Sequence, residues 1–262
     1  MMNSFRRFVS HATVALGLSA LLAGCATPMA DYPGIVAAPD RSEADRKNDQ
    51  RRNPVELFGF TGARPGMKVL DMGSGGGYST EMLARGVAPG GTVYSQTPAG
   101  LFPGAIKAYA ARAQSPAMKN AVRLERPFDD PLPPGVGGFD LITFFFFYHD
   151  TVWLEVDRAR MNRRLYEALK PGGILVVADH SARPGDGANV TKSLHRIEER
   201  VVRRELEAAG FQFVSEGSFL RNPADPRDTP VQKNTVPNDE FVLKYRKPER
   251  NNNVDQSMYN QR

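Results

Sequence analysis

The fold of this chain is decided by the stretch Lys68-Val69-Leu70-Asp71-Met72-Gly73-Ser74-Gly75-Gly76-Gly77-Tyr78-Ser79-Thr80. Val69 and Leu70 end a short apolar run, which is typical of a strand buried on both faces. Residues 79–85 follow as a helix, with Ser or Thr at its start and an acid in its first turn. A strand, a glycine turn and a helix N-terminus together present bare backbone N–H groups to a ligand above the sheet. Glycine suits this turn because a Cβ would hold the ligand away and would disfavour a positive φ.

The spacing of the glycines separates the candidate ligands. A dinucleotide-binding loop requires Gly-x-Gly-x-x-Gly, but Tyr78 stands where the last glycine would be. A P-loop ends in Gly-Lys-Ser/Thr, which this stretch lacks. The pattern that remains, an acid followed by Gly-x-Gly-x-Gly from Asp71 to Gly77, resembles motif I of the class I S-adenosylmethionine-dependent methyltransferases. A plain tight turn between a strand and a helix is the alternative interpretation.

The rest of the chain predicts a repeating order of strands and helices. Further strands are expected at residues 92–95, 121–125, 139–148 and 174–180, with helices at 101–113, 152–169 and 189–209. Segments 211–220 and 240–246 alternate like strands and predict an antiparallel C-terminal hairpin around a long polar loop. The prediction is an α/β fold with a doubly wound, mostly parallel, seven-stranded sheet, which is the Rossmann-like architecture that the resemblance implies. Ligands of such sheets bind beyond the carboxyl ends of the strands, where the strand order reverses.

The resemblance implies which residues bind S-adenosylmethionine. Asp71 would orient the glycine loop and the amino-acid end of the cofactor, or it caps the loop without touching a ligand. At the end of the third predicted strand, Phe128 would stack on adenine and Asp129 would accept from its amino group; both are equally interpretable as turn residues. The cofactor-binding residues that the resemblance implies are Asp71, Gly73, Ser74, Gly75, Gly77, Gln96, Phe128 and Asp129.

Gln96 departs from the family pattern at the position that we match to the end of the second strand. Class I enzymes usually carry Asp or Glu there, which accepts hydrogen bonds from both ribose hydroxyls. A glutamine amide offers one acceptor oxygen and no charge, whereas a carboxylate offers two oxygens and a charge. We expect the exchange to weaken cofactor binding by about 1–3 kcal/mol, which is the scale of one charged hydrogen bond.

Tyr148, His149 and Asp150 end the fourth predicted strand, where the acceptor should meet the methyl group. Methyl transfer from a sulfonium depends chiefly on alignment. His149 is the candidate general base because its ordinary pKa lies near neutrality. Tyr148 could face the sulfonium as a cation–π partner, and Asp150 either takes part in catalysis or caps the helix that begins near Thr151.

Two neighbouring segments carry further histidines. Asp179 and His180 end the fifth strand and could shape the same pocket, whereas His195 falls on a predicted helix and is expected to be packing or surface. No metal site is predicted, because four scattered histidines and one cysteine show no ligand spacing.

Residues 1–25 predict a secretory signal. Arg6 and Arg7 precede an apolar segment, and Leu22-Ala23-Gly24-Cys25 resembles a bacterial lipobox in which Cys25 becomes lipidated. An ordinary cleaved signal is the alternative. Cys25 is the only cysteine, so no disulfide can form within the chain. The residue after it, Ala26, favours an exported protein anchored at the periplasmic face of the outer membrane rather than the inner membrane.

The remaining boundaries follow from composition. Residues 26–39 predict a flexible tether, 40–248 the folded domain and 249–262 a disordered polar tail. Within the domain, charged residues 40–52 predict a solvated helix, or a lid over the far end of the cofactor. The net charge is only +5, of which Arg6 and Arg7 supply two, and so small a charge argues against a nucleic-acid partner. The oligomeric state stays open, as does whether the loop 221–239 closes over a ligand.

From about residue 40 to residue 248 the chain resembles a group of exported, predicted methyltransferases of bacteria. Beyond motif I, the likeness is carried by segments such as 169–173, 194–197 and 220–225. The resemblance implies transfer of methyl from S-adenosylmethionine to a small molecule or envelope component outside the cytoplasm. The alternative is a catalytically degenerate binding protein of the same fold, favoured by Gln96 and by export from the compartment in which the cofactor is made. A dinucleotide oxidoreductase is the third and weakest interpretation.

Overall fold

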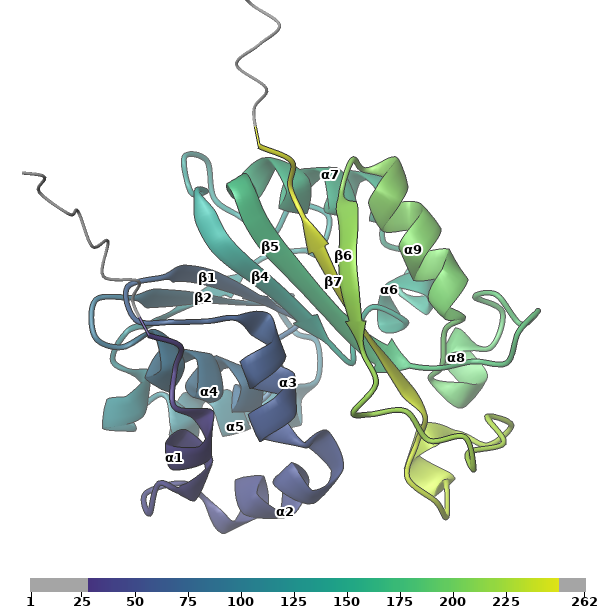
Figure 1. Cartoon of the computed structure of the whole chain (residues 1–262), viewed down its shortest axis with the longest axis horizontal. Helices are drawn as coiled ribbons and strands as arrows, with labels where there is room; N and C mark the ends of the chain where they lie inside the picture. Colours follow the sequence, from purple (N-terminus) through teal and green to yellow (C-terminus); the bar gives the residue numbers. More distant parts are fainter. Residues whose placement is uncertain (1–27, 250–262) are drawn as a thin grey trace, which may run out of the picture.

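The computed structural model describes residues 28–249, in which helices flank both faces of one seven-stranded sheet (Figure 1). The strand order is β3-β2-β1-β4-β5-β7-β6. Strands β1 to β5 run parallel, and β7 is antiparallel to both of its neighbours. The fold predicted from the sequence is therefore confirmed, including its antiparallel C-terminal hairpin. The predicted signal peptide with Cys25 lies outside the described residues, as do residues 250–262.

The elements have the following bounds. The strands are β1 (Lys68–Met72), β2 (Thr92–Thr97), β3 (Ala121–Glu125), β4 (Phe139–Phe145), β5 (Leu169–His180), β6 (Gln212–Gly217) and β7 (Glu240–Arg246). The helices are α1 (Tyr32–Ala37), α2 (Glu43–Arg52), α3 (Pro54–Thr61), α4 (Tyr78–Val87), α5 (Pro103–Arg112), α6 (Asp150–Trp153), α7 (Arg158–Ala168), α8 (Thr191–Leu194) and α9 (Glu199–Ala208), with 3₁₀ turns at Pro116–Met118 and Val231–Lys233.

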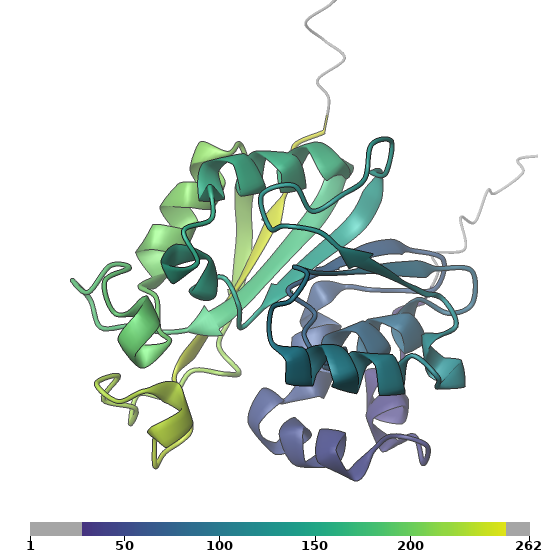
Figure 2. The same ribbon diagram turned by 180° about the vertical axis from the view of Figure 1, so that it is seen from behind.

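The sheet is buried between two apolar layers. Val69 and Leu70 are both fully buried and point to opposite faces of β1. Val69 packs with the cluster that includes Leu57 of α3 and Met82 of α4, and Leu70 packs with the cluster that includes Leu165 of α7. Figures 1 and 2 show these helices on the two sides of the sheet. The continuous apolar run of β1 therefore has a simple cause, since neither face of the strand meets solvent.

The N-terminal boundary of the domain differs from the prediction. Residues 32–37 form α1 instead of a flexible tether, and the side chain of Asp31 accepts a hydrogen bond from the N–H of Gly34 as its cap. Tyr32 is 1% exposed, and its ring centroid lies 5.6 Å from that of Phe58 in α3. The apolar side of this short helix completes the layer over α3 and α4, so the domain begins earlier than residue 40.

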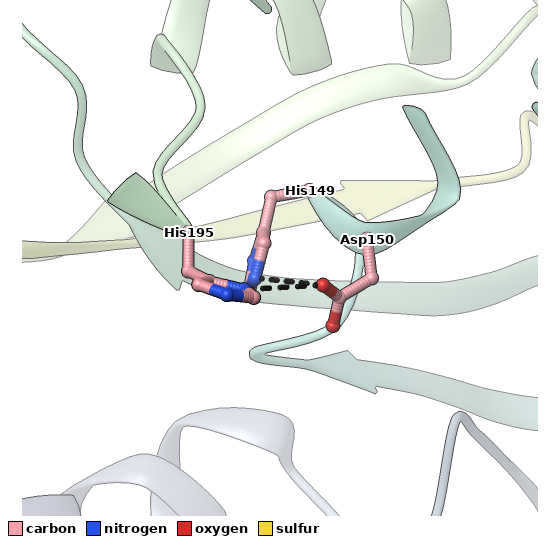
Figure 3. A group of neighbouring side chains, drawn as sticks. All are labelled: His149, Asp150 and His195. Carbon is pink, nitrogen blue, oxygen red and sulfur yellow. Dashed lines mark ion pairs between the residues drawn. The ribbon is translucent and has the colours of Figure 1, made fainter. Parts of the chain in front are cut away.

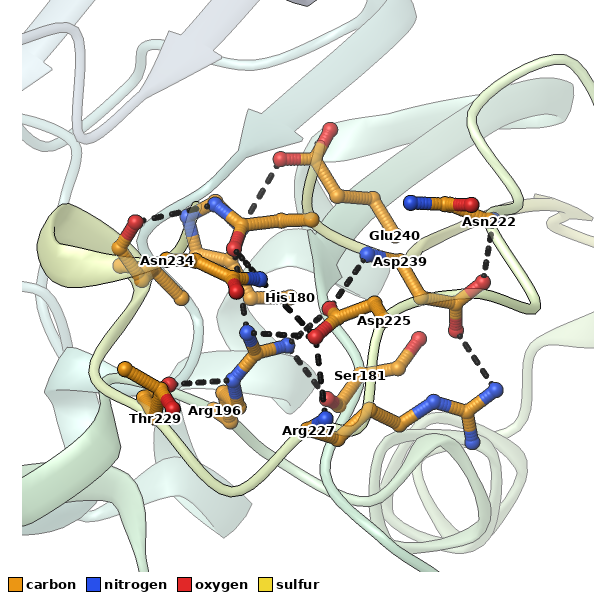
Figure 4. Close-up of polar contacts among 12 residues, drawn as sticks. His180, Ser181, Arg196, Asn222, Asp225, Arg227, Thr229, Asn234, Asp239 and Glu240 are labelled. Carbon is orange, nitrogen blue, oxygen red and sulfur yellow. Dashed lines mark hydrogen bonds and ion pairs between the residues drawn. The ribbon is translucent and has the colours of Figure 1, made fainter. Parts of the chain in front are cut away.

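Both long helices predicted in the second half of the chain are broken. Residues 152–169 divide into α6 and α7, and residues 189–209 divide into α8 and α9. The second break has a clear cause. His195 adopts a left-handed φ of 54°, and Ile197 then pairs with Ser181 beyond the end of β5. This extended stretch buries Arg196 completely, and its guanidinium binds Asp225 at 2.8 Å (Figure 4).

Arg196 is also the reason that the loop 221–239 is ordered. Its guanidinium donates to the carbonyls of Ser181 and Thr229 and to the side chains of Asp225 and Asn238 (Figure 4). A buried arginine is stable only when such acceptors surround it. The loop is therefore folded around one charged group beyond the end of β5. Over residues 28–249, no helix has the length and apolarity needed to cross a membrane.

Candidate active site

The predicted site residues meet at the carboxyl ends of the strands, beside the reversal of strand order between β1 and β4. The glycine loop follows β1, and Tyr148, His149 and Asp150 follow β4. Pairing between β1 and β4 sets Asp71 level with Thr143, and pairing between β1 and β2 sets it level with Ser95. The parallel register thus brings segments from three strands to one edge of the sheet, and we refer to the space beyond this edge as the crevice.

Asp71 is fully buried and holds the glycine loop to the start of α4. Its Oδ2 accepts hydrogen bonds from the hydroxyls of Ser79 at 2.8 Å and Thr80 at 2.7 Å. Its Oδ1 accepts from the hydroxyl of Thr143 on β4 at 2.9 Å. Burial raises the pKa of Asp71, although the three hydroxyl donors act against that rise. Among residues 28–249 all its contacts are therefore internal, and its role here is to position the loop.

The glycine loop is open to a ligand at one residue. Gly75 has φ +53°, and a Cβ built on it would lie 3.9 Å from its nearest neighbour, the carbonyl oxygen of Gly73. A Cβ on Gly77 would instead lie 2.9 Å from the ring of Tyr109 on α5. Ser74 points inward, because its hydroxyl bonds those of Ser95 at 2.7 Å and Thr97 at 2.9 Å. The backbone around Gly75 is therefore the part of the loop with room above it.

Gln96 lies beneath the glycine loop rather than facing the crevice. It is fully buried; its Oε1 accepts from the N–H of Gly73 at 3.1 Å, and its Nε2 donates to the carbonyl of Arg126 at 2.6 Å. β2 continues one residue further and ends at Thr97. The strand therefore ends at Thr97, one residue beyond the position matched to the family acid from sequence. Gln96 braces the loop with both ends of its amide, so ribose binding by this side chain is not compatible with the observed contacts.

A cavity of about 460 Å³ lies beyond the ends of β2 and β3. Its walls are Pro98–Leu101, Pro127–Asp129 and Leu154–Asp157. Phe128 is 3% exposed and its ring centroid lies 5.2 Å from that of Phe147, and a Cβ built on Gly73 would lie 3.1 Å from the Phe147 side chain. Phe128 and Asp129, predicted to hold adenine, therefore line a cavity of the size that small ligands occupy. Whether they bind adenine stays a prediction.

Arg112 of α5 ties the charged N-terminal helix α2 to the glycine loop. Its guanidinium donates to both oxygens of Asp45 at 2.6 and 2.8 Å, and to Glu81. It also donates to the carbonyl of Gly76 at 2.9 Å. Arg112 outweighs the effect of burial and lowers the pKa of the Asp45 carboxyl. The segment 40–52 is thus solvated on one side only: Glu43, Arg46 and Lys47 are exposed as predicted, whereas Arg41 and Asp45 are buried.

Arg52, the last residue of α2, lies over the same crevice. Its guanidinium lies 4.9 Å from the ring centroid of Tyr78 and 5.1 Å from that of Phe146. Its Nε is buried and has no hydrogen-bond partner within residues 28–249. Burial lowers the pKa of Arg52 to about 10, although the carboxylates of Glu240 and Asp71 favour its charge. Arg52 is therefore a cation with an unused donor near the glycine loop, and no sequence motif marks it.

Tyr148 points away from the crevice, which corrects the prediction that it faces the sulfonium. The side chain is fully buried in the core, and its hydroxyl donates to Glu205 of α9 at 2.8 Å. The same hydroxyl accepts from Asn162 of α7 at 2.8 Å. The chain turns at Phe146, which has φ +58°, so the side chains after β4 do not keep the alternation of a strand. Tyr148 therefore fastens the helices of one layer.

His149 has no ring nitrogen free to act as a base. Its Nδ1 lies 2.7 Å from Oδ1 of Asp179, and its Nε2 lies 3.2 Å from Oδ1 of Asp150. Burial disfavours the charged ring, but Asp179 and Asp150 together raise the pKa of His149 to about 10. A ring protonated at neutral pH cannot accept a proton from a substrate, so the general-base role predicted for His149 is corrected.

Asp150, Asp179 and His180 lie beside His149, as their places at strand ends predict. His180 is 6% exposed, and its Nδ1 lies 2.9 Å from Oε1 of Glu240 without the alignment of a hydrogen bond. The sequence missed His195, whose Nδ1 lies 3.4 Å from Oδ1 of Asp150 (Figure 3). No local signal could have found it, because it reaches the site only through the break between α8 and α9.

Comparison with known proteins also finds similarity to methyltransferases. Residues 70–177 match the model of the family described as "Methyltransferase domain". A relative from Shewanella sp. (strain W3-18-1), the ubiquinone/menaquinone biosynthesis C-methyltransferase UbiE, is 30% identical over 131 residues, which are 50% of this chain and 48% of the relative. The chain thus spans about half the length of the curated relatives that it matches.

Solved structures extend the likeness over most of the described chain. A SAM-dependent methyltransferase from Aquifex aeolicus superimposes with a TM-score of 0.55 at 18% identity, covering 78% of this chain and 96% of that one. The [4+2]-cyclase SpnF superimposes with a TM-score of 0.56 at 20% identity, covering 79% and 82%. At such identities the likeness concerns the fold. The chain therefore has the fold of the class I S-adenosylmethionine-dependent methyltransferases, and residues 70–177 resemble the methyltransferase domain family.

Proposed function

We propose that this protein transfers methyl from S-adenosylmethionine to a small molecule or envelope component. The observation that carries the proposal is the glycine loop, held by Asp71 and open above Gly75 at the reversal of strand order. The match of residues 70–177 to the methyltransferase domain family supports it. Methyl transfer from a sulfonium depends on alignment, so the absence of a free base at His149 does not argue against it.

The two ends of the crevice suit the two ends of the cofactor. S-adenosylmethionine carries a carboxylate at its amino-acid end, and Arg52 offers a buried, unused donor there. Its adenine would enter the cavity between Phe128 and Leu101, with Asp129 as acceptor for the amino group. The backbone near Gly75 would lie beneath the ribose and sulfonium. Alignment of the methyl group then follows from contacts at both ends of the ligand.

Binding calorimetry on the purified full chain tests this proposal. We expect S-adenosylmethionine and S-adenosylhomocysteine to bind with one site each. Gly75→Ala should weaken both by at least tenfold, because its methyl group enters the open space above the loop. Gly135→Ala is the matched control, since Gly135 also has a positive φ and no neighbour within 4 Å but lies far from the loop in sequence. Absence of heat at millimolar ligand would reject the proposal, as would equal affinities of the two variants.

The second candidate is a binding protein of the same fold without methyl transfer. It is favoured by Thr97, a neutral residue where β2 ends, and by the likeness to a protein described as a [4+2]-cyclase. In this case the cavity beside Phe128 would hold another ligand, and the chain would bind no adenosyl compound. Micromolar binding of S-adenosylmethionine by the native chain would rule this candidate out.

We further propose that the protein is exported and anchored by a lipid on Cys25 at the periplasmic face of the outer membrane. The support is the sequence Leu22-Ala23-Gly24-Cys25 after an apolar segment with Arg6 and Arg7. Fractionation of cells that express the native chain and Cys25→Ser tests the anchor. The native chain should enter the membrane fraction with incorporated fatty acid, and Cys25→Ser should lose both. A native chain without fatty acid would contradict the anchor.

A further inference from the structure

His149, Asp150 and His195 converge on one point beside the crevice (Figure 3). One ligand atom from each lies within 4.8 Å of the others. Nε2 of His149 is 3.2 Å from Oδ1 of Asp150, and Nδ1 of His195 is 3.4 Å from the same oxygen. We propose that these three residues form a binding site for a divalent transition-metal ion.

The two separations that involve Asp150 fit ligands around one ion. An ion held at about 2.1 Å by nitrogen and oxygen ligands separates adjacent ligand atoms by about 3.0 Å in octahedral and about 3.4 Å in tetrahedral geometry. The two distances to Asp150 fall within that range. Hydrogen bonds would also fit these distances, but the surroundings of the three residues favour a metal.

The hydrogen-bond partners of His149 and Asp150 are of the kind that orients metal ligands in proteins. Metal-binding histidines usually offer their second nitrogen to a carboxylate, which fixes the ring and its tautomer. Here Nδ1 of His149 contacts Oδ1 of Asp179 at 2.7 Å, which leaves Nε2 facing Asp150 and His195. Asp179 is itself fixed by the backbone N–H groups of His149 and His180. Asp150 accepts from the indole N–H of Trp153 at 2.7 Å, so the carboxylate ligand also has a supporting partner.

The charges and the solvent exposure of these residues also favour a metal ion. Asp150 and Asp179 are 6% and 0% exposed, and two buried carboxylates require compensation. In the structure the protonated ring of His149 supplies part of this compensation, and a divalent cation that displaces its Nε2 proton would balance both charges. The side chain of His195 is 32% exposed, so the point of convergence opens to solvent on that side. An ion there would keep positions for water or for an oxygen of a second ligand.

The donor set selects the class of ion. Two imidazole nitrogens and one carboxylate favour zinc, cobalt or iron over magnesium and calcium, which prefer oxygen ligands. The backbone of His195 also bears on the proposal, because its left-handed φ of 54° is uncommon for a residue other than glycine. This conformation turns the ring toward Asp150 (Figure 3). If the proposed function holds, the open positions would take an oxygen of the methyl acceptor; that extension rests on the proposed function, whereas the site does not.

Titration of the metal-stripped full chain with Co²⁺ tests the site without any cofactor. We expect one equivalent to bind with a visible d–d absorption band, and one equivalent of Zn²⁺ to displace it. His195→Asn should weaken Co²⁺ binding by more than a hundredfold, and asparagine tolerates the left-handed backbone. Asp179→Asn should weaken binding by about ten- to a hundredfold through the orientation of His149.

His180→Gln is the matched control. His180 lies next to His149, with ring centroids 5.7 Å apart, but it is not among the three converging residues. Binding should be unchanged in this variant. Absence of a Co²⁺ band at 1 mM metal would overturn the proposal, as would equal binding by His195→Asn and the native chain, or Mg²⁺ binding as tight as Zn²⁺. Because the titration contains no S-adenosylmethionine, its outcome is independent of the calorimetric test of the proposed function.

Discussion

The two sides of the crevice are built on different principles. On the side of β1 and β2, the glycine loop is held by Asp71 and Gln96 through hydroxyl, amide and backbone hydrogen bonds. On the side of β4 and β5, charged groups converge instead, with His149 between Asp150 and Asp179. The first arrangement fixes the backbone beneath a ligand. The second brings together imidazole and carboxylate groups that could bind an ion. The β1–β2 side therefore positions a ligand, whereas the β4–β5 side supplies the groups that could react with it or bind an ion.

The largest effect is expected for Asp71→Ala. The substitution leaves three buried hydroxyls without their acceptor and opens a void beneath the loop, so we expect a loss of about 3–4 kcal/mol in the free energy of unfolding. Urea unfolding measures it. Asp228→Ala is the control, because its ion pair with Arg183 is exposed and should contribute less than about 1 kcal/mol. A loss at Asp71 no greater than at Asp228 would refute the positioning role.

The next effect is expected for Arg112→Met, which removes the group that joins α2, α4 and the glycine loop. Asp45 and Glu81 then lose their shared cation while they stay buried. We expect a loss of about 2–3 kcal/mol, on the scale of breaking a largely buried ion pair. Hydrogen exchange should show α2 opening first. If α2 kept its native protection in this variant, the view that Arg112 holds it down would be wrong.

A smaller effect on stability is expected for Gln96→Glu, and its effect on cofactor binding should be opposite to the one that the sequence predicts. From sequence, an acid here would tighten cofactor binding. In the structure the second oxygen of a glutamate would face the carbonyl of Arg126 at the place of a donor, so we expect a loss of about 1–2 kcal/mol in stability and no tighter binding. Thr97→Asp places the acid at the end of the strand instead. Tighter S-adenosylmethionine binding by Gln96→Glu than by Thr97→Asp would contradict this account.

The smallest effect concerns the pH dependence of stability at acidic pH and involves Asp45. Although burial acts against it, Arg112 holds the pKa of Asp45 below its ordinary value. A lowered pKa in the fold contributes stability above the pKa of the unfolded chain, near 4, and this contribution is lost as pH falls through the lower, folded value. Unfolding measured between pH 6 and pH 3 should therefore show a smaller decline for Asp45→Asn than for the native chain. An identical decline in both would contradict the assignment.

The same contrast explains how far the sequence could be interpreted. The glycine loop is local: Asp71 and the hydroxyls of Ser79 and Thr80 lie within one strand–turn–helix unit, so the motif predicts the geometry. The alternation of strands and helices and the C-terminal hairpin are predicted by similarly local periodicity. The proposed metal ligands His149, Asp150 and His195 cannot be predicted from local sequence. His195 lies 46 positions after His149 and approaches it only where a predicted helix breaks and Arg196 is buried. Helical periodicity contains no signal for that break.

Two errors at strand ends have a related cause. The sequence matches Gln96 to the end of β2, but the strand continues to Thr97, which pairs with Glu125 of β3. One residue of offset reverses the face to which a side chain points. Tyr148 is expected at the crevice because it follows the end of β4, whereas its side chain is buried in the core beside Phe144. In both cases, only tertiary register decides the direction of the side chain.

The measurement that bears most directly on the account is a crystal structure of the chain with S-adenosylhomocysteine. We expect the ribose over Gly75, adenine in the cavity beside Phe128 and the ligand carboxylate within hydrogen-bond distance of Arg52. Ligand density elsewhere, or no ligand above the glycine loop at saturating concentration, would contradict this expectation.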